Sequence, residues 1–343
     1  MDEKLITFAI PSYNSEAYMR KCIDSILTGG DEVEIIIVDD GSKDGTGAIA
    51  DEYEKAHPNI CRAVHQENGG HGEGVNQGMR RASGLYYKVV DSDDWVDEKA
   101  LAELLATVRR HKEEGTLPDL YITNFIYDRV CDNESFTRRY TKNMPTGEFF
   151  GWDKVKRFRG SSVLLMHALM YKTSVLRECG LSLPKHTFYV DNIFAYVPLP
   201  YVKTMFYLNA DLYHYYIGRA DQSVNISSFS KRTDQQNRVM RIMAEAYDLR
   251  EIGKTNKQLK KYMLHVLACL MIITITFTVA VPSKEKYAAL KELWQNIKEK
   301  DKWLYGKLKY RSYPAIYTFL PRPLGRAVII AGYKATRKKV KLG

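Results

Sequence analysis

Four short apolar runs alternate with amphipathic stretches along the first ninety residues of the chain. The apolar runs are residues 5–10, 33–38, 61–65 and 86–90. The stretches between them, whose apolar positions recur at helical spacing, are residues 16–27, 46–56 and 74–82. Strands that are apolar without alternation are typical of a parallel sheet that helices cover on both faces. The pattern therefore predicts an α/β fold built on an open, mostly parallel sheet.

A cluster of carboxylates follows the fourth apolar run. Asp91, Asp93 and Asp94 come directly after it, at the edge where open α/β sheets bind their ligands. Two carboxylates separated by one residue can share a hard divalent cation, and Mg²⁺ or Mn²⁺ held by few protein ligands keeps coordination positions free for phosphate oxygens. The cluster therefore indicates a metal–diphosphate site. The alternative is that Asp93 or Asp94 caps a helix that begins near Asp97.

Residues suited to a nucleotide follow the first two runs. Tyr13 has a ring that can stack on a base, and Asn14 can cap the next helix. Asp39 and Asp40 open an acidic turn whose carboxylates can accept hydrogen bonds from a base N–H or from ribose hydroxyls. A Gly-rich turn with Thr46 at the start of the next helix is the structural alternative, and it is compatible with ligand binding.

Four motifs, in this order, resemble those of the family 2 glycosyltransferases with the GT-A fold. They are residues 9–14 (Ala-Ile-Pro-Ser-Tyr-Asn), 36–42 (Ile-Ile-Val-Asp-Asp-Gly-Ser), 68–70 (Asn-Gly-Gly) and 90–95 (Val-Asp-Ser-Asp-Asp-Trp). The resemblance covers about residues 4–225. It implies inverting transfer of a sugar from a nucleotide-diphosphate donor, most commonly a UDP-sugar, to a glycan or lipid-linked acceptor in cell-surface polysaccharide synthesis.

The resemblance and the residue types together give the expected donor contacts. These are Pro11, Tyr13, Asn14, Asp39, Asp40, Gly70, His71, Asn76, Asp91, Ser92 and Arg219. Asp91 and Asp93 match the Asp-x-Asp metal pair, with Asp93 as the preferred direct ligand of Mn²⁺ or Mg²⁺. The arginine that many members carry after the Asn-Gly-Gly motif is missing, so His71 and the backbone N–H groups of the next helix are expected to face phosphate. Arg219 is expected to neutralise the departing diphosphate.

Asp191 is the expected catalytic base. An acidic residue of a similar motif, often Glu-Asp, has this role in the family, and Val190 replaces the preceding acid here. A sugar hydroxyl is a poor nucleophile, and a carboxylate within hydrogen-bond reach can remove its proton during attack. The alternative is that Asp191 caps a helix or pairs with a nearby base.

Two other classes of function stay open at this point. A sugar nucleotidyltransferase also uses a doubly wound sheet and a metal, but it would need a Gly-rich basic loop where residues 11–14 stand. A non-catalytic scaffold that binds glycans or membranes is the other class. The presence of both Asp93 and Asp191 argues against a scaffold.

The length of 343 residues accommodates one large domain and a smaller one. The resemblance places a GT-A catalytic domain in residues 1–225, with a nucleotide-sugar half at about 1–98 and an acceptor half at about 99–225. Residues 226–343 are expected to form a mainly helical, basic extension that associates with a membrane.

The net charge of +10 arises from the end of the chain. Residues 302–343 hold eleven Lys and Arg and no Asp or Glu, and tyrosines and aliphatic residues are interleaved with these charges. This composition is typical of a segment that lies on an anionic membrane surface. Nucleic acid is the rival partner. We favour the inner membrane surface, because lipid-linked acceptors are common in the resembling family and none of the motifs reads bases.

An uncharged segment precedes this basic end. Residues 263–281 hold no Asp, Glu, Lys or Arg and would reach about 28 Å as a helix, just short of the hydrocarbon core. A single crossing would export the basic end, against the positive-inside tendency, so we expect a buried or interfacial helix. The start shows no signal-peptide pattern, and the five cysteines are scattered. These features predict a cytoplasmic protein, peripheral at the cytoplasmic face of the membrane.

Overall fold

The computed structural model describes residues 3–129, 134–217 and 232–340 and divides the chain into two units. The first unit comprises Met1–Lys156 and Leu164–Tyr216. The second comprises Arg157–Val163 and Ile217–Gly343. The boundary that we expected at residue 225 lies outside the described residues.

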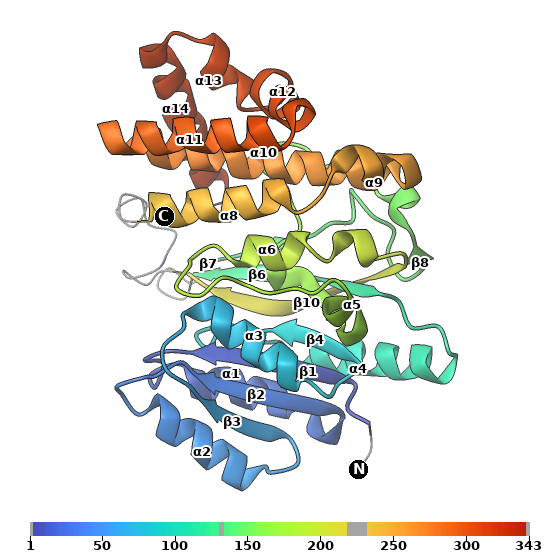
Figure 1. Ribbon diagram of the computed structural model, residues 1–343. Helices are drawn as coiled ribbons and strands as arrows, with labels where there is room; N and C mark the ends of the chain where they lie inside the picture. The colour runs from blue at the N-terminus through green and yellow to red at the C-terminus, as the bar shows by residue number, and fades with distance from the viewer. Residues whose placement is uncertain (1–2, 130–133, 218–231, 341–343) are drawn as a thin grey trace. The chain divides into compact units, whose positions relative to one another are not determined.

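The first unit is built on one sheet with the strand order β3-β2-β1-β4-β9-β6-β10-β5 (Figure 1). Four parallel strands form its first half: β1 (Ile6–Ser12), β2 (Val33–Asp39), β3 (Cys61–His65) and β4 (Tyr86–Val89). The other strands are β5 (Trp95–Val96), β6 (Leu120–Arg129), β7 (Glu134–Arg138), β8 (Phe149–Phe150), β9 (Leu169–Lys172) and β10 (Met205–Tyr216). Every residue of β1 and of β2 is buried, as expected for strands covered on both faces.

The second half of the sheet is mixed rather than parallel. Strand β9 runs antiparallel to both β4 and β6, and β5 runs antiparallel to β10. The expectation of an open, mostly parallel sheet therefore holds for the first four strands and for the pair of β6 and β10, but not for β9 or β5. A short apolar run does not encode the direction in which it joins a sheet, so the sequence pattern could not distinguish the two arrangements.

The helices of the first unit are α1 (Met19–Leu27), α2 (Thr46–Ala56), α3 (His71–Arg81), α4 (Glu98–Glu113), α5 (Thr173–Glu178) and α6 (Asp191–Tyr196). The first three begin within three residues of their predicted positions. The predicted start of the first helix was three residues early, because a turn closed onto the carbonyl of Ser15 precedes it. The predicted start of α3 was three residues late. Gly70, at a φ of 81°, turns the chain and makes His71 the first helical residue.

Helix α3 approaches strand β1 closely at Gly78. A Cβ atom built at Gly78 would lie 2.5 Å from the Cβ of Ala9 and 2.8 Å from the hydroxyl of Tyr87. We therefore expect Gly78→Ala to lower the free energy of unfolding by about 1–3 kcal/mol, measured by chemical denaturation. Gly306→Ala, in the helix at Lys302–Arg311, is the control, since a Cβ there meets nothing within 4 Å. Equal stability of Gly78→Ala and the wild type would contradict this close packing.

The second unit is helical in its described residues. Its helices are α8 (Thr233–Glu245), α9 (Leu249–Thr255), α10 (Lys257–Ala280), α11 (Lys284–Lys300), α12 (Lys302–Arg311), α13 (Ala315–Phe319) and α14 (Arg322–Val340). Side chains cap four of them: Asn256 accepts from the N–H of Leu259 at the start of α10, and Asp248, Ser283 and Asp301 cap α9, α11 and α12.

Helix α10 is the centre of the helical unit. It is long and apolar enough to cross a membrane, but 72% of its most apolar window is buried inside the protein. It contacts α8, α9, α11, α12 and α14. The buried Thr274 in this helix accepts a hydrogen bond from Gln236 of α8 at 3.0 Å. These contacts agree with the prediction of a buried helix.

Candidate active site

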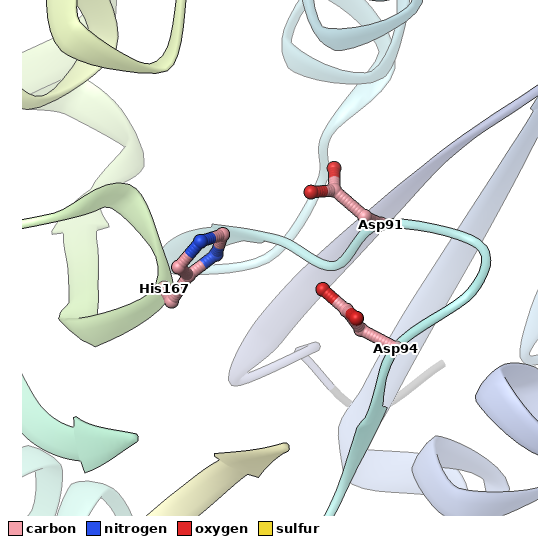
Figure 2. A group of neighbouring side chains, drawn as sticks. All are labelled: Asp91, Asp94 and His167. Carbon is pink, nitrogen blue, oxygen red and sulfur yellow. The ribbon is translucent and has the colours of Figure 1, made fainter. Parts of the chain in front are cut away.

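Three side chains form a compact cluster at the end of β4. One ligand atom each of Asp91, Asp94 and His167 lies within 4.8 Å of the other two. Figure 2 shows that the two carboxylates extend from the turn after β4 and that the imidazole faces them from a separate segment. That segment is the short 3₁₀ helix η3 (Met166–Ala168), which leads into β9.

Asp94 is held firmly by strand β10. Its Oδ2 accepts a hydrogen bond from the hydroxyl of Tyr213 at 2.5 Å, and its Oδ1 accepts one from the N–H of Tyr216 at 2.8 Å. The N–H of Asp91 donates to the same Tyr213 oxygen at 3.2 Å. Burial, followed by the charges of Asp93 and Asp91, raises the pKa of Asp94 well above its ordinary value. These hydrogen bonds thus hold the turn in a conformation that keeps several carboxyl groups close together.

His167 presents a neutral, unpartnered nitrogen to this acidic turn. Its side chain is buried, and Nδ1 has no hydrogen-bond partner among the described residues. Burial lowers the pKa of His167 to about 4. The buried ammonium of Lys88 donates to the backbone carbonyl of His167 at 2.6 Å and fixes the segment. A neutral imidazole with a free lone pair, beside two carboxylates, is a donor set that fits a divalent cation.

The donor set only partly matches the expected metal pair. Asp91 is in the cluster, whereas Asp93, the preferred ligand from the sequence, is not, and its role as a ligand stays a prediction. The suggested capping role of Asp93 or Asp94 is wrong, because Asp97 caps α4 by accepting from the N–H of Ala100 at 2.9 Å. His167 was not predicted as a ligand, since 76 residues separate it from Asp91 and no spacing motif connects them.

His71 interacts with the acidic turn through a hydrogen bond and with Asp191 through its charge. Its Nε2 lies 2.7 Å from Oδ1 of Asp91. Burial opposes protonation of His71, but the charge and hydrogen bond of Asp91, with the charges of Asp191 and Asp93, outweigh it and raise the pKa of His71. The raised pKa favours the protonated, positively charged form of His71. The phosphate-facing role of His71 stays a prediction.

Asp191 is the first residue of α6 and stays apart from the metal cluster. It is partly buried. Burial raises the pKa of its carboxyl, and the charge of His71 opposes this shift. The preceding residues His186 and Tyr189 have φ values of 48° and 66°, which non-glycine residues rarely adopt. A second carboxylate thus lies near the acidic turn, on a loop with an unusual backbone, as is common at functional sites.

This loop is tied to α3 by Asn76. The Asn76 amide donates to the carbonyl of Leu183 at 2.9 Å and accepts from its N–H at 2.9 Å. The N–H of His186 also donates to the carbonyl of Gly69 at 2.7 Å. The geometry therefore gives no support to the expected donor contact of Asn76, which is buried and positions the loop instead.

The glycosyl transferase family 2 profile matches residues 7–168. EpsH of Bacillus subtilis, a glycosyltransferase by name, is 28% identical over 237 residues. The alignment covers 63% of this chain and 62% of the length of EpsH. Residues 7–168 of the chain thus carry a glycosyl transferase family 2 domain.

Solved structures with the same fold cover nearly the whole chain. Residues 1–349 of S. aureus TarS, in complex with UDP-GlcNAc, match with a TM-score of 0.66 at 17% identity, over 98% of this chain and 91% of that chain. The mannosyltransferase PcManGT from Pyrobaculum calidifontis, in complex with GDP-Man and Mn²⁺, matches with a TM-score of 0.52 at 14% identity, over 98% and 87%. At these identities the likeness shows the GT-A fold.

The expected nucleoside residues of the chain divide into two groups. Asp39 is the last residue of β2 and accepts from the N–H of Ser42 at 3.0 Å, and the exposed Tyr13 follows β1. Asp40, by contrast, accepts from the backbone N–H groups of Gly69 and Gly70 at 2.7 and 2.8 Å. It is buried, so the geometry favours a role in holding the Asn-Gly-Gly loop over the expected donor contact.

The remaining expected contacts are found around the same loops. The side chain of Asn14 accepts from the N–H of Lys43 at 2.9 Å, and the buried hydroxyl of Ser92 lies 2.7 Å from that of Ser15. Pro11 is a buried residue of β1. These contacts join the loops after β1, β2 and β4. Arg219 lies outside the described residues.

Proposed function

We propose that this family 2 glycosyltransferase transfers a sugar from a nucleotide-diphosphate donor, preferably a UDP-sugar, to a hydroxyl group of a glycan or lipid-linked acceptor in cell-surface polysaccharide synthesis. The observation that carries the proposal is the position of His71, whose Nε2 lies 2.7 Å from Oδ1 of Asp91 in the acidic turn and whose pKa is also raised by the charge of Asp191. One side of the site is suited to a diphosphate and the other to a nucleophile. The structure of PcManGT with GDP-Man and Mn²⁺ supports the proposed class of donor and the need for a metal.

The cluster of Asp91, Asp94 and His167 would hold the divalent cation. Mg²⁺ prefers ligands that are all oxygen, whereas Mn²⁺ accepts an imidazole nitrogen, so the donor set favours Mn²⁺. Asp93 is the further candidate ligand from the turn. When bound, the metal would neutralise charge on the departing diphosphate.

Asp191 and His71 would have separate roles in the transfer. Asp191 would accept the proton of the attacking hydroxyl, and its raised pKa makes it a better base than an ordinary carboxylate. His71, whose raised pKa favours protonation, would face the diphosphate. A covalent intermediate needs a carboxylate that is free to attack, and Asp91 and Asp94 are bound by His71, Tyr213 and Tyr216. These hydrogen bonds support the proposal of a single displacement with inversion.

The test of this proposal is a screen of nucleotide sugars with Mn²⁺ or Mg²⁺. A true donor stabilises the native state by mass action, and its hydrolysis or transfer releases the nucleoside diphosphate. We expect one UDP-sugar to raise the unfolding temperature only when the metal is present. Formation of a sugar nucleotide from a sugar phosphate and a nucleoside triphosphate would instead identify a nucleotidyltransferase and overturn the proposal.

His65, which the sequence did not single out, is expected to make donor binding depend on pH. Its two ring nitrogens lie 3.1 Å from Asp39 and 2.9 Å from Asp51. Hydrogen bonds to Asp51 and to Asp39 raise the pKa of His65. Both contacts need an N–H on the His65 ring, and the ring carries two N–H groups only when it is protonated. The hydrogen bond from His65 to Asp39 is therefore fully present below about pH 6.5 and is lost as the pH rises through the raised pKa of His65.

Donor affinity should accordingly fall as the pH rises above about 6.5, by at most about fivefold, because His65 is partly exposed. Titration calorimetry at several pH values checks this. The variant His65→Asn should lack the slope, while His57→Asn, at the exposed end of α2, should keep it. An identical slope in His65→Asn would exclude this role.

A further inference from the structure

The end of the helical unit exposes an unusual number of large apolar side chains. Of the eleven exposed large hydrophobic residues in the described part of the chain, five lie within residues 310–328. They are Tyr310 (44% exposed), Ile316 (43%), Phe319 (68%), Leu324 (52%) and Val328 (40%). We call these five residues the tail surface. Single exposed apolar residues are ordinary, but a group of this size marks an interaction site.

Contacts between α12, α13 and α14 indicate that the tail surface is continuous. The rings of Tyr310 and Phe319 lie 6.0 Å apart, centre to centre. Helices α13 and α14 pack together, and Leu324 and Val328 lie one turn apart on one face of α14. The neighbouring Ile329 is 95% buried, so α14 buries one apolar residue while it exposes two others.

The charged residues of the chain segment that carries the tail surface are all basic. No Asp or Glu follows Asp301, whereas eleven Lys and Arg do. Arg311 and Arg326 are exposed beside the apolar side chains, and Lys334 is exposed further along α14. Aromatic and aliphatic side chains that enter the acyl boundary, with basic residues at the headgroups, are the two components of binding to an anionic membrane.

We propose that the tail surface docks onto an anionic lipid membrane. The burial of α10 in the helical unit makes this attachment peripheral. A second copy of the chain is a poor occupant, because each copy would bring eleven uncompensated positive charges to the contact. Nucleic acid would satisfy the charges but not the aliphatic side chains of Ile316, Leu324 and Val328. The inference concerns the helical unit and does not depend on the proposed transfer reaction.

The test is co-sedimentation of the full chain with lipid vesicles. We expect binding to vesicles that contain phosphatidylglycerol, little binding to pure phosphatidylcholine, and release at high salt. The double variants Phe319→Ser/Leu324→Ser and Arg326→Glu/Lys334→Glu should each bind about tenfold or more weakly. The control Tyr287→Ser/Lys291→Glu carries equivalent changes on exposed residues of α11 and should bind like the wild type.

The outcomes separate the possible partners. Equal binding of the tail variants and the wild type would overturn the proposal, as would equal binding to neutral and anionic vesicles. Displacement of the chain from vesicles by a DNA or RNA duplex at equal charge concentration, or a dimer that the Phe319→Ser/Leu324→Ser variant loses, would also overturn it. Thermal stabilisation by donor should be unchanged in all tail variants, so failure here leaves the proposed reaction untouched.

Discussion

Asp191→Asn is expected to reduce sugar transfer by about 10²–10⁴-fold while donor affinity stays close to that of the wild type. The amide is nearly isosteric with the carboxyl but cannot accept a proton from the acceptor hydroxyl. Asp191 begins α6 and stands outside the cluster of Asp91, Asp94 and His167, so the substitution leaves the donor side intact. The measurements are the rate of transfer to acceptor and the dissociation constant of the donor with Mn²⁺.

A matched variant separates this effect from a general loss of negative charge. Asp31→Asn changes an exposed aspartate of the 3₁₀ helix η1 (Gly30–Glu32) and should transfer like the wild type. Near-normal transfer by Asp191→Asn would show that another group removes the proton. Loss of donor binding in Asp191→Asn would place this residue on the donor side.

The first half of the sheet could be predicted because all of its strands have the same apolar composition. Strands β1 to β4 are short, apolar and separated by helices of ordinary length, so their order and the edge that carries Asp39 and Asp91 follow from the pattern. The GT-A resemblance added the position of Asp191, which no periodicity reveals. The same features do not encode the direction of β9 or the packing of the helical unit.

The metal cluster shows where prediction from the sequence ends. Asp91 and Asp94 are three positions apart in the sequence, but the choice between Asp93 and Asp94 depends on which side chain forms the hydrogen bond to Tyr213 of β10. His167 joins them only because β9 inserts between β4 and β6. Asp40 and Asn76 have side chains that suit a ligand equally well, and only the folded loops show that both are used internally.

His167→Ala is expected to weaken Mn²⁺ binding by about 10-fold or more and to bring Mn²⁺ and Mg²⁺ affinities closer together. The reason is that the variant loses its imidazole nitrogen and keeps only oxygen ligands, which suit Mg²⁺ as well. Manganese binding is measured directly, by electron paramagnetic resonance of free Mn²⁺, so the readout does not depend on turnover.

Parallel variants decide which carboxylate completes the site. Asp91→Asn should lose Mn²⁺ binding, because Asp91 offers a carboxylate oxygen to the cluster. If Asp93→Asn also loses Mn²⁺ binding, Asp93 is a ligand, as the sequence resemblance implies. If Asp93→Asn keeps Mn²⁺ binding, Asp94 is the second carboxylate ligand. Unchanged Mn²⁺ affinity in His167→Ala would remove the imidazole from the site, and the unpartnered Nδ1 would then need another explanation.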